Sequence, residues 1–282
     1  MVKTPKDPLR IKASKLNTGR PNTGKFSAAK IRADELAVAQ NLCPSRNQAQ
    51  ALILAGRIKN EREERIEKAG QLLDKNTILI LTPGRRYASR GGLKLEGALE
   101  DFGIDPSGLT CLDLGASTGG FTDCLLKKGA AKVTAVDVGR GLMDLSLTKD
   151  PRVKLIENQN ARFLSELPPG ALGEPFDLAV ADLSFISLAL ILPQAAPLLN
   201  LGGKLVVMVK PQFEVGRGQV GKGGIVRDQV LIKEAVDRIA KLAPTLSPPM
   251  IETARAPSKL KGQDGNQEVF LLLTRSDAEP NL

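Results

Sequence analysis

Four apolar segments that have the character of buried strands each carry a charged residue where the strand is expected to stop. They are TCLDLG (110–115), KVTAVD (132–137), FDLAVAD (176–182) and KLVVMVK (204–210), and their charges are Asp113, Asp137, Asp182 and Lys210. In an open parallel sheet the carboxyl ends of the strands share one edge, and ligands bind there. The sequence therefore predicts three carboxylates and a lysine gathered at one site.

Expected strands and helices alternate from residue 93 onward. Helical patterns cover 93–102, 121–129, 187–199 and 228–242, and further strands are expected at 153–157, 250–256 and 267–274. Strands that alternate with helices form βαβ units around a parallel sheet. The predicted fold class is α/β, a Rossmann-like domain over 93–275 with a mostly parallel sheet and an antiparallel last strand.

A small α+β module is predicted at 31–81. One helix covers 33–40, and a second begins after Ser45 with Gln48 three residues later, the pattern of a capping box. Short strands are expected at 57–59 and 78–81. Tails at 1–30 and 276–282 and a linker at 82–92 complete the predicted organisation.

Composition excludes several kinds of chemistry. The chain of 282 residues has no His, and its three cysteines form no C-x-x-C pair, so neither His catalysis, nor a metal centre, nor a disulfide framework is expected. No run reaches 18 apolar residues, and the N-terminus lacks the apolar region of a signal peptide. A reducing, cytoplasmic setting is the expectation.

Positive charge is concentrated in two segments. Residues 1–30 hold eight basic residues against one acid, which is typical of an arm that binds phosphates, a solvated extension or a transit sequence. The segment 85–94 contains three arginines and a lysine with no acid, which favours a nucleic-acid contact, and its Tyr87 could stack on a base.

A glycine-rich turn follows the strand at 110–114 and precedes a helix. Gly115, Gly119 and Gly120 permit a tight turn and a close backbone approach to a ligand, and Asp137 ends the next strand, where it can bind ribose hydroxyls. A dinucleotide fingerprint would need glycine where Ser117 stands, and Asp113 would repel a pyrophosphate. The carboxylate instead suits the amino group and sulfonium of S-adenosylmethionine.

Six longer motifs follow one another along the chain: SRGGLKLEGAL (89–99), LDLGASTGGFTD (112–123), AVDVG (135–139), DLSFISL (182–188), VKPQFEVG (209–216) and GNQEVF (265–270). Together they resemble the TlyA family, proteins with an S4 domain and an FtsJ-like methyltransferase domain that are often labelled hemolysin A. The resemblance implies S-adenosylmethionine-dependent 2′-O-methylation of ribosomal RNA, mainly at cytidine. It also implies that 31–81 is an S4 RNA-binding domain.

The resemblance assigns residues as well. The catalytic set that it implies is Lys94, Asp182, Lys210 and Glu268. Asn160 becomes a candidate contact beside the adenine, and Asp182 joins the candidate cofactor contacts. The candidate RNA contacts are Arg46, Arg57, Arg85, Arg86 and Arg90.

The chemistry needs such a set, because a ribose hydroxyl is a poor nucleophile and must be held in line with the methyl group. Lys210 either activates or deprotonates the hydroxyl, or stays charged and orients an oxygen lone pair.

Methylation of a base fits poorly, since the chain has DLSF at 182–185 and no cysteine at a neighbouring strand end. A non-catalytic RNA-binding assembly factor and a membrane-active hemolysin are the competing functions.

Overall fold

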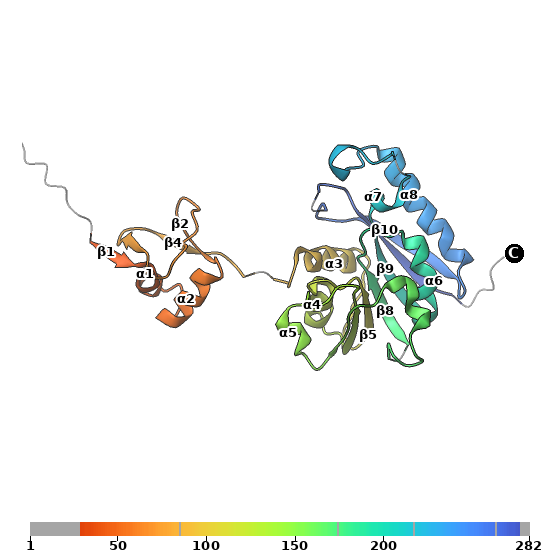
Figure 1. Ribbon diagram of the computed structural model, residues 1–282, viewed down its shortest axis with the longest axis horizontal. Helices are drawn as coiled ribbons and strands as arrows, with labels where there is room; N and C mark the ends of the chain where they lie inside the picture. The colour runs from red at the N-terminus through yellow and green to blue at the C-terminus, as the bar shows by residue number, and fades with distance from the viewer. Residues whose placement is uncertain (1–28, 85, 174, 217, 263, 277–282) are drawn as a thin grey trace, which may run out of the picture. The chain divides into compact units, whose positions relative to one another are not determined.

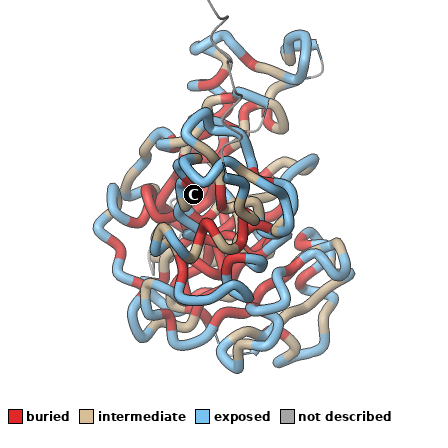
Figure 2. The backbone as a smooth tube through the Cα atoms, turned by 90° about the vertical axis from the view of Figure 1, so that its left-hand side faces the viewer, coloured by how far each residue is buried: buried red, intermediate tan, exposed pale blue. Residues whose placement is uncertain are grey.

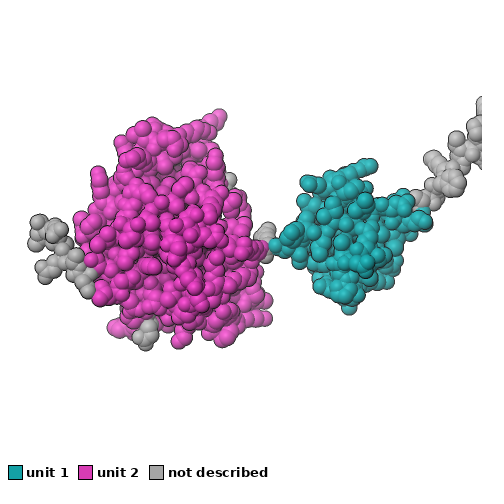
Figure 3. Space-filling model, turned by 180° about the vertical axis from the view of Figure 1, so that it is seen from behind, with its two compact units in different colours: residues 1–84 teal, residues 85–282 magenta. Residues whose placement is uncertain are grey.

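The computed structural model describes residues 29–84, 86–173, 175–216, 218–262 and 264–276. The chain divides into two compact units, residues 1–84 and 85–282, which Figure 3 shows in different colours. The division falls within the segment that the sequence treats as a linker. Except for residues 29 and 30, the predicted basic tail lies outside the described residues.

Two short helices and two small antiparallel sheets make up the first unit (Figure 1). The helices are α1 (Ala33–Ala39) and α2 (Arg46–Leu54). The strand pairs are β1 (Lys30–Arg32) with β3 (Leu72–Asp74), and β2 (Ile58–Asn60) with β4 (Leu79–Leu81). Ser45 accepts a hydrogen bond from the Gln48 amide at 3.3 Å, which confirms the predicted start of α2.

Sequence pattern misses β1 and β3, because a strand of three residues carries too little alternation to be recognised. The buried residues of this unit form one small core in which Leu36, Ile53, Ile58 and Ile66 are almost fully covered. The unit thus has a core of its own, separate from that of the larger unit.

The second unit is built on a seven-stranded sheet with the order β10-β11-β9-β8-β5-β6-β7. Its strands are β5 (Thr110–Leu114), β6 (Lys132–Val136), β7 (Val153–Ile156), β8 (Phe176–Ala181), β9 (Leu199–Val209), β10 (Met250–Pro257) and β11 (Val269–Arg275). The pairs from β7 through to β9 are parallel, and β11 is antiparallel to both β9 and β10. The predicted mostly parallel sheet with an antiparallel last strand is confirmed.

Helices cover both faces of this sheet. They are α3 (Arg90–Asp101), α4 (Gly120–Lys127), α5 (Leu145–Thr148), α6 (Leu192–Ala195), α7 (Pro211–Glu214) and α8 (Gln229–Leu242). Leu205 and Val207 of β9 belong to the core under α6 and α8, whereas Val206 and Met208 belong to the core under α3 and α4. Figure 2 shows these buried layers in red inside the larger unit. No helix in the described part of the chain is long and apolar enough to cross a membrane.

Two predicted helices differ from the structure. The helix expected over 187–199 is broken into α6 and two 3₁₀ turns, Leu188–Leu190 and Ala196–Leu198, because Pro193 and Pro197 each start a new short helix. The helix expected from residue 93 begins at Arg90, since the Ser89 hydroxyl accepts from the Gly91 amide and caps it.

The strand ends place the site. Asp137, Asp182 and Lys210 come directly after β6, β8 and β9. Val269 pairs with Val209 in the antiparallel β9–β11 ladder, so Glu268 lies at the same edge as Lys210. The sheet therefore presents these four residues along one edge.

Candidate active site

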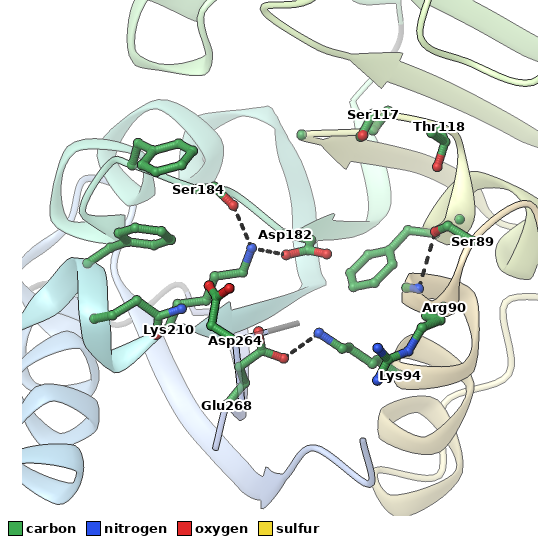
Figure 4. A pocket seen from close by; sticks show the side chains of 18 of the residues that line it. Ser89, Arg90, Lys94, Ser117, Thr118, Asp182, Ser184, Lys210, Asp264 and Glu268 are labelled. Carbon is green, nitrogen blue, oxygen red and sulfur yellow. Dashed lines mark hydrogen bonds and ion pairs between the residues drawn. The ribbon is translucent and has the colours of Figure 1, made fainter. Parts of the chain in front are cut away.

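A cavity of about 710 Å³ opens at the carboxyl edge of the sheet. Its walls come from the start of α3, the turn after β5, the loop after β8, α7 and the segment before β11. All four residues of the predicted catalytic set, Lys94, Asp182, Lys210 and Glu268, line it. Figure 4 shows them as two neighbouring pairs, Lys210 with Asp182 and Lys94 with Glu268.

The first pair joins the ends of two neighbouring strands. The Lys210 Nζ lies 2.7 Å from Asp182 Oδ1, and it also donates a hydrogen bond to the Ser184 hydroxyl at 2.8 Å. The Lys210 side chain is 11% exposed and that of Asp182 is 23% exposed. The pair is therefore fixed within the protein but open to a substrate.

The second pair joins residues that are 174 positions apart in the chain. The Lys94 Nζ donates to Glu268 Oε2 at 2.5 Å. The side chains are 11% and 3% exposed, so each charge depends on the other for compensation. This pair connects α3 to the residue before β11 and lines the cavity.

A second cavity of about 440 Å³ adjoins the first. Both cavities are lined by Gly115, Ser117, Asp182, Ser184 and Phe185, so they meet at these residues. The second cavity extends to Asp137 at the end of β6 and to Asn160. Its volume lies within the range of small-molecule sites, roughly 300 to 1,000 Å³.

Asp137 is held in place by the backbone. Its Oδ2 accepts from the Ser117 amide at 2.7 Å, and its Oδ1 accepts from the Gly139 amide at 2.6 Å. A carboxylate has about four acceptor positions. Two of them therefore remain for the hydroxyl groups of a bound ribose, as the sequence predicts.

Glycine is required at the turn itself. Gly115 has φ +85°, and a Cβ there would lie 2.7 Å from the Asp182 carbonyl oxygen. A Cβ on Gly120 would lie 2.1 Å from the Ser89 hydroxyl. Both glycines line the larger cavity, so the turn brings bare backbone to the cavity wall. This arrangement fits an adenosine-type cofactor.

Asp113 and Gly119 do not lie where a cofactor contact is predicted. Asp113 is an internal residue of β5, and the alternation of a strand points its side chain under α4, where the Thr122 hydroxyl donates to it at 2.6 Å. It is fully buried and lines neither cavity. Burial raises the pKa of its carboxyl to about 7, and the charges of Asp182 and Asp137 add to the rise.

Gly119 also lines neither cavity. It precedes α4 with φ +90°, and a Cβ there would lie 2.3 Å from Leu147. Glycine is needed at this position so that the turn can pack against Leu147. Asn160, by contrast, is exposed at the second cavity, and its side-chain oxygen accepts from the Arg162 amide at 2.9 Å.

The predicted RNA contacts are spread over both units. Arg46 pairs with Asp34 at 3.2 Å and Glu35 at 3.1 Å, and Arg57 donates to the Thr82 carbonyl. Both residues belong to the smaller unit. Both are occupied within the protein but remain partly accessible to solvent.

In the larger unit, Arg86 pairs with Glu96 at 2.7 Å, and Arg90 is the one predicted RNA contact among the described residues that lines the larger cavity. Arg85 lies outside the described residues. The prediction that Tyr87 could stack on a base is wrong, because Tyr87 is 4% exposed and packs in the core beside α3 and α4.

Two phenylalanines at the cavity were not recognised from the sequence. Phe185 and Phe213 have ring centroids 5.0 Å apart, and both line the larger cavity. Phe185 is 91% exposed, with φ +65° in the left-handed region that a bulky residue rarely adopts. Their positions within DLSF and KPQF, directly beside Asp182 and Lys210, were the available signal.

The buried carboxylate of Glu214 links the loop after β8 to the segment after β9. Glu214 accepts from the Ser187 hydroxyl at 2.7 Å and from the Leu188 amide at 2.8 Å, and it lies 3.6 Å from Arg238. Burial raises the pKa of the Glu214 carboxyl. The loop after β8 is thereby fixed to the helix that follows Lys210.

Comparisons with known proteins give consistent matches. Residues 87–275 match the family model described as FtsJ-like methyltransferase. The chain is 44% identical over 252 residues to the 16S/23S rRNA (cytidine-2′-O)-methyltransferase TlyA of Mycobacterium tuberculosis, which covers 89% of this chain and 92% of that protein. It is 40% identical to Hemolysin A of Brachyspira hyodysenteriae, over 84% of this chain and 97% of that protein. A solved putative hemolysin from Streptococcus thermophilus matches with a TM-score of 0.65 and 38% identity, over 89% of this chain and 90% of that one.

Proposed function

Because this chain belongs to the TlyA family of FtsJ-like methyltransferases, we propose that it methylates the 2′-hydroxyl of a cytidine in ribosomal RNA. The methyl donor is S-adenosylmethionine, which supplies an electrophilic methyl group on a sulfonium when bound. The observation that carries the proposal is the meeting of two cavities at Asp182 and Ser184, with Lys210 beside them. The smaller cavity suits an adenosine, and the larger suits a nucleotide of RNA.

The residues of the smaller cavity would hold the donor. Asp137 would accept hydrogen bonds from the ribose hydroxyls, and Asn160 would lie beside the adenine. The backbone of Gly115 and Ser117 would face the rest of the donor, because both residues also line the larger cavity. Asp113 would not touch the donor. It would stabilise the turn from beneath, because it accepts a hydrogen bond from the Thr122 hydroxyl.

Lys210 and Asp182 would act on the acceptor hydroxyl. The ion pair of Lys210 with a carboxylate and its hydrogen bond to a hydroxyl favour an ammonium that donates a further N–H to the ribose oxygen. A lone pair of that oxygen then faces the methyl group. As the oxygen–carbon bond forms and the carbon–sulfur bond of the donor breaks, the hydroxyl proton would pass to Asp182 Oδ2. The donor would leave as the neutral thioether S-adenosylhomocysteine. The gain comes mainly from positioning, which can supply roughly 7–11 kcal/mol.

Lys94 and Glu268 would form part of the wall of the acceptor cavity. Their pair is nearly neutral as a unit, so it places polar groups near the nucleotide without a large local charge. The exposed ring of Phe185, next to Phe213, would stack on the base of the target nucleotide. A base that stacks there has left its helix, as in other enzymes that reach into nucleic acid.

The remaining basic residues would contact the RNA backbone. Arg90 at the cavity and Arg86 nearby would bind phosphates close to the target nucleotide. We infer that the smaller unit is an S4-type RNA-binding domain that uses Arg46 and Arg57. A ribosomal substrate and three free cysteines are both consistent with activity in the cytoplasm.

Transfer of a labelled methyl group from S-adenosylmethionine tests the proposal, with ribosomal subunits from a strain that lacks the enzyme as the acceptor. Lys210→Ala should abolish transfer while cofactor binding, measured by calorimetry, persists. Lys233→Ala is the matched control, because it also removes a lysine paired with an aspartate but on the exposed face of α8. Full activity of Lys210→Ala would refute the site. Cofactor binding by the wild type without any transfer would favour the assembly-factor function.

A further inference from the structure

The Lys210 side chain can rotate freely in principle, whereas its proposed role requires one N–H to point at the acceptor oxygen. A lysine ammonium carries three equivalent N–H donors on a flexible four-carbon stem. An ammonium that is held only by the attraction of a carboxylate can still rotate about its bond to the stem. A hydrogen bond to a hydroxyl at a fixed position stops this rotation and gives the other N–H groups set directions. A residue that supplies such a hydroxyl would therefore set the direction in which Lys210 donates.

Ser184 occupies that position. Its Oγ lies 2.8 Å from the Lys210 Nζ, while Asp182 Oδ1 lies 2.7 Å from the same nitrogen. Figure 4 shows both interactions converging on the Lys210 amine. Among the described residues, this is the one hydrogen bond that the Ser184 side chain makes. The hydroxyl is therefore free of competing partners.

The location of Ser184 fits this role. Ser184 lines both cavities, as Asp182 does, whereas Lys210 lines the larger cavity only. The Lys210 amine is thus held by two residues at the boundary between the cavities. The methyl group would pass from donor to acceptor at this boundary. The loop that carries Ser184 is itself anchored, because Glu214 accepts from Ser187 and Leu188 just beyond it. An anchored loop keeps the hydroxyl at a constant distance from the amine.

We propose that Ser184 is a positioning residue for methyl transfer, whose hydroxyl directs the Lys210 amine toward the acceptor oxygen. The inference rests on the proposed function and adds to it a residue that lines both cavities and acts through Lys210. Ser184 contributes to the chemical step and not to the affinity for either ligand. Its loss should lower kcat and leave the binding constants alone.

Ser184→Ala and Ser184→Thr test this proposal as a pair. Alanine removes the acceptor, and threonine retains it at an exposed position with room for one more methyl group. The kcat for ribosomal subunits should fall about tenfold in Ser184→Ala, in line with a lost hydrogen bond to a charged group. Ser184→Thr should recover most of that loss. KM for subunits and the Kd for S-adenosylhomocysteine should change little in either variant.

Three results would overturn the proposal: an unchanged kcat in Ser184→Ala, an equal loss in Ser184→Thr, or a defect confined to cofactor affinity. If the wild-type protein itself transfers no methyl group, the proposed function fails, and chemical labelling still tests whether Ser184 restrains the Lys210 amine. In the cofactor-free protein, acetic anhydride should modify Lys210 faster in Ser184→Ala than in the wild type or Ser184→Thr, as read by mass spectrometry. Equal labelling rates in all three would contradict the contact.

Discussion

The buried pair of Lys94 and Glu268 gives a prediction whose size follows from its geometry. At 2.5 Å, with an effective dielectric constant of about 20, the attraction between the two charges is about 7 kcal/mol. Desolvation of two nearly buried groups offsets most of it, so the pair adds little net stability. Removing one partner leaves the other charge uncompensated, which costs about 3–5 kcal/mol.

The single variants Lys94→Met and Glu268→Met should each lower the free energy of unfolding by that amount. The double variant should lie within about 2 kcal/mol of the wild type, because it leaves no unpaired charge. For a unit of about 200 residues, each single variant should lower Tm by roughly 6–20 °C. Urea unfolding measures the free energies of unfolding, and thermal unfolding measures Tm. Both are followed by far-UV circular dichroism, because the chain has no Trp for fluorescence.

The control for this cycle is a surface lysine. Lys259→Met removes contacts to Glu100 and Asp101 from a side chain that is 48% exposed, and it should leave the free energy of unfolding nearly unchanged. A double variant that loses the sum of the two single losses would refute the reasoning. Such additivity would mean that Lys94 and Glu268 do not depend on each other.

Three further variants probe the surroundings of the site. Folded Asp113 keeps a proton up to a pKa of about 7, whereas the unfolded chain loses it near 3.8, so the unfolding free energy of the wild type should fall as pH rises between these values. Asp113→Asn should remove that slope, which is worth about 2–3 kcal/mol between pH 5 and pH 8, in urea unfolding at these two pH values. Gly115→Ala should weaken S-adenosylhomocysteine binding in calorimetry, because the new Cβ would press on the Asp182 carbonyl. Glu214→Gln should cost about 1–3 kcal/mol of unfolding free energy, because one buried donor loses its acceptor.

The sequence predicts the sheet edge well. Asp137, Asp182 and Lys210 follow strands whose apolar runs are unmistakable, and parallel topology brings such ends together. Lys94 and Glu268 are different, because no local pattern distinguishes them from surface charges. Only the family resemblance singled them out, and the structure places them 2.5 Å apart in the same cavity.

Other features depended on contacts that no local pattern contains. Asp113 looks like a strand-end residue, yet β5 continues to Leu114, and the alternation of the strand turns its carboxylate inward. Tyr87 sits in a basic segment but packs into the core. The exposed Phe185 depends on a left-handed backbone within its loop, which the sequence of that loop does not reveal.

One edge of this sheet is expected to deliver a methyl group to a sugar oxygen of RNA. Mapping the label after reaction with ribosomal subunits, by nuclease digestion and mass spectrometry, is the direct test of this expectation. We expect labelled 2′-O-methylcytidine, formed by the wild type and absent with Lys210→Ala. Label on a base, or label that survives the loss of Lys210, would contradict it.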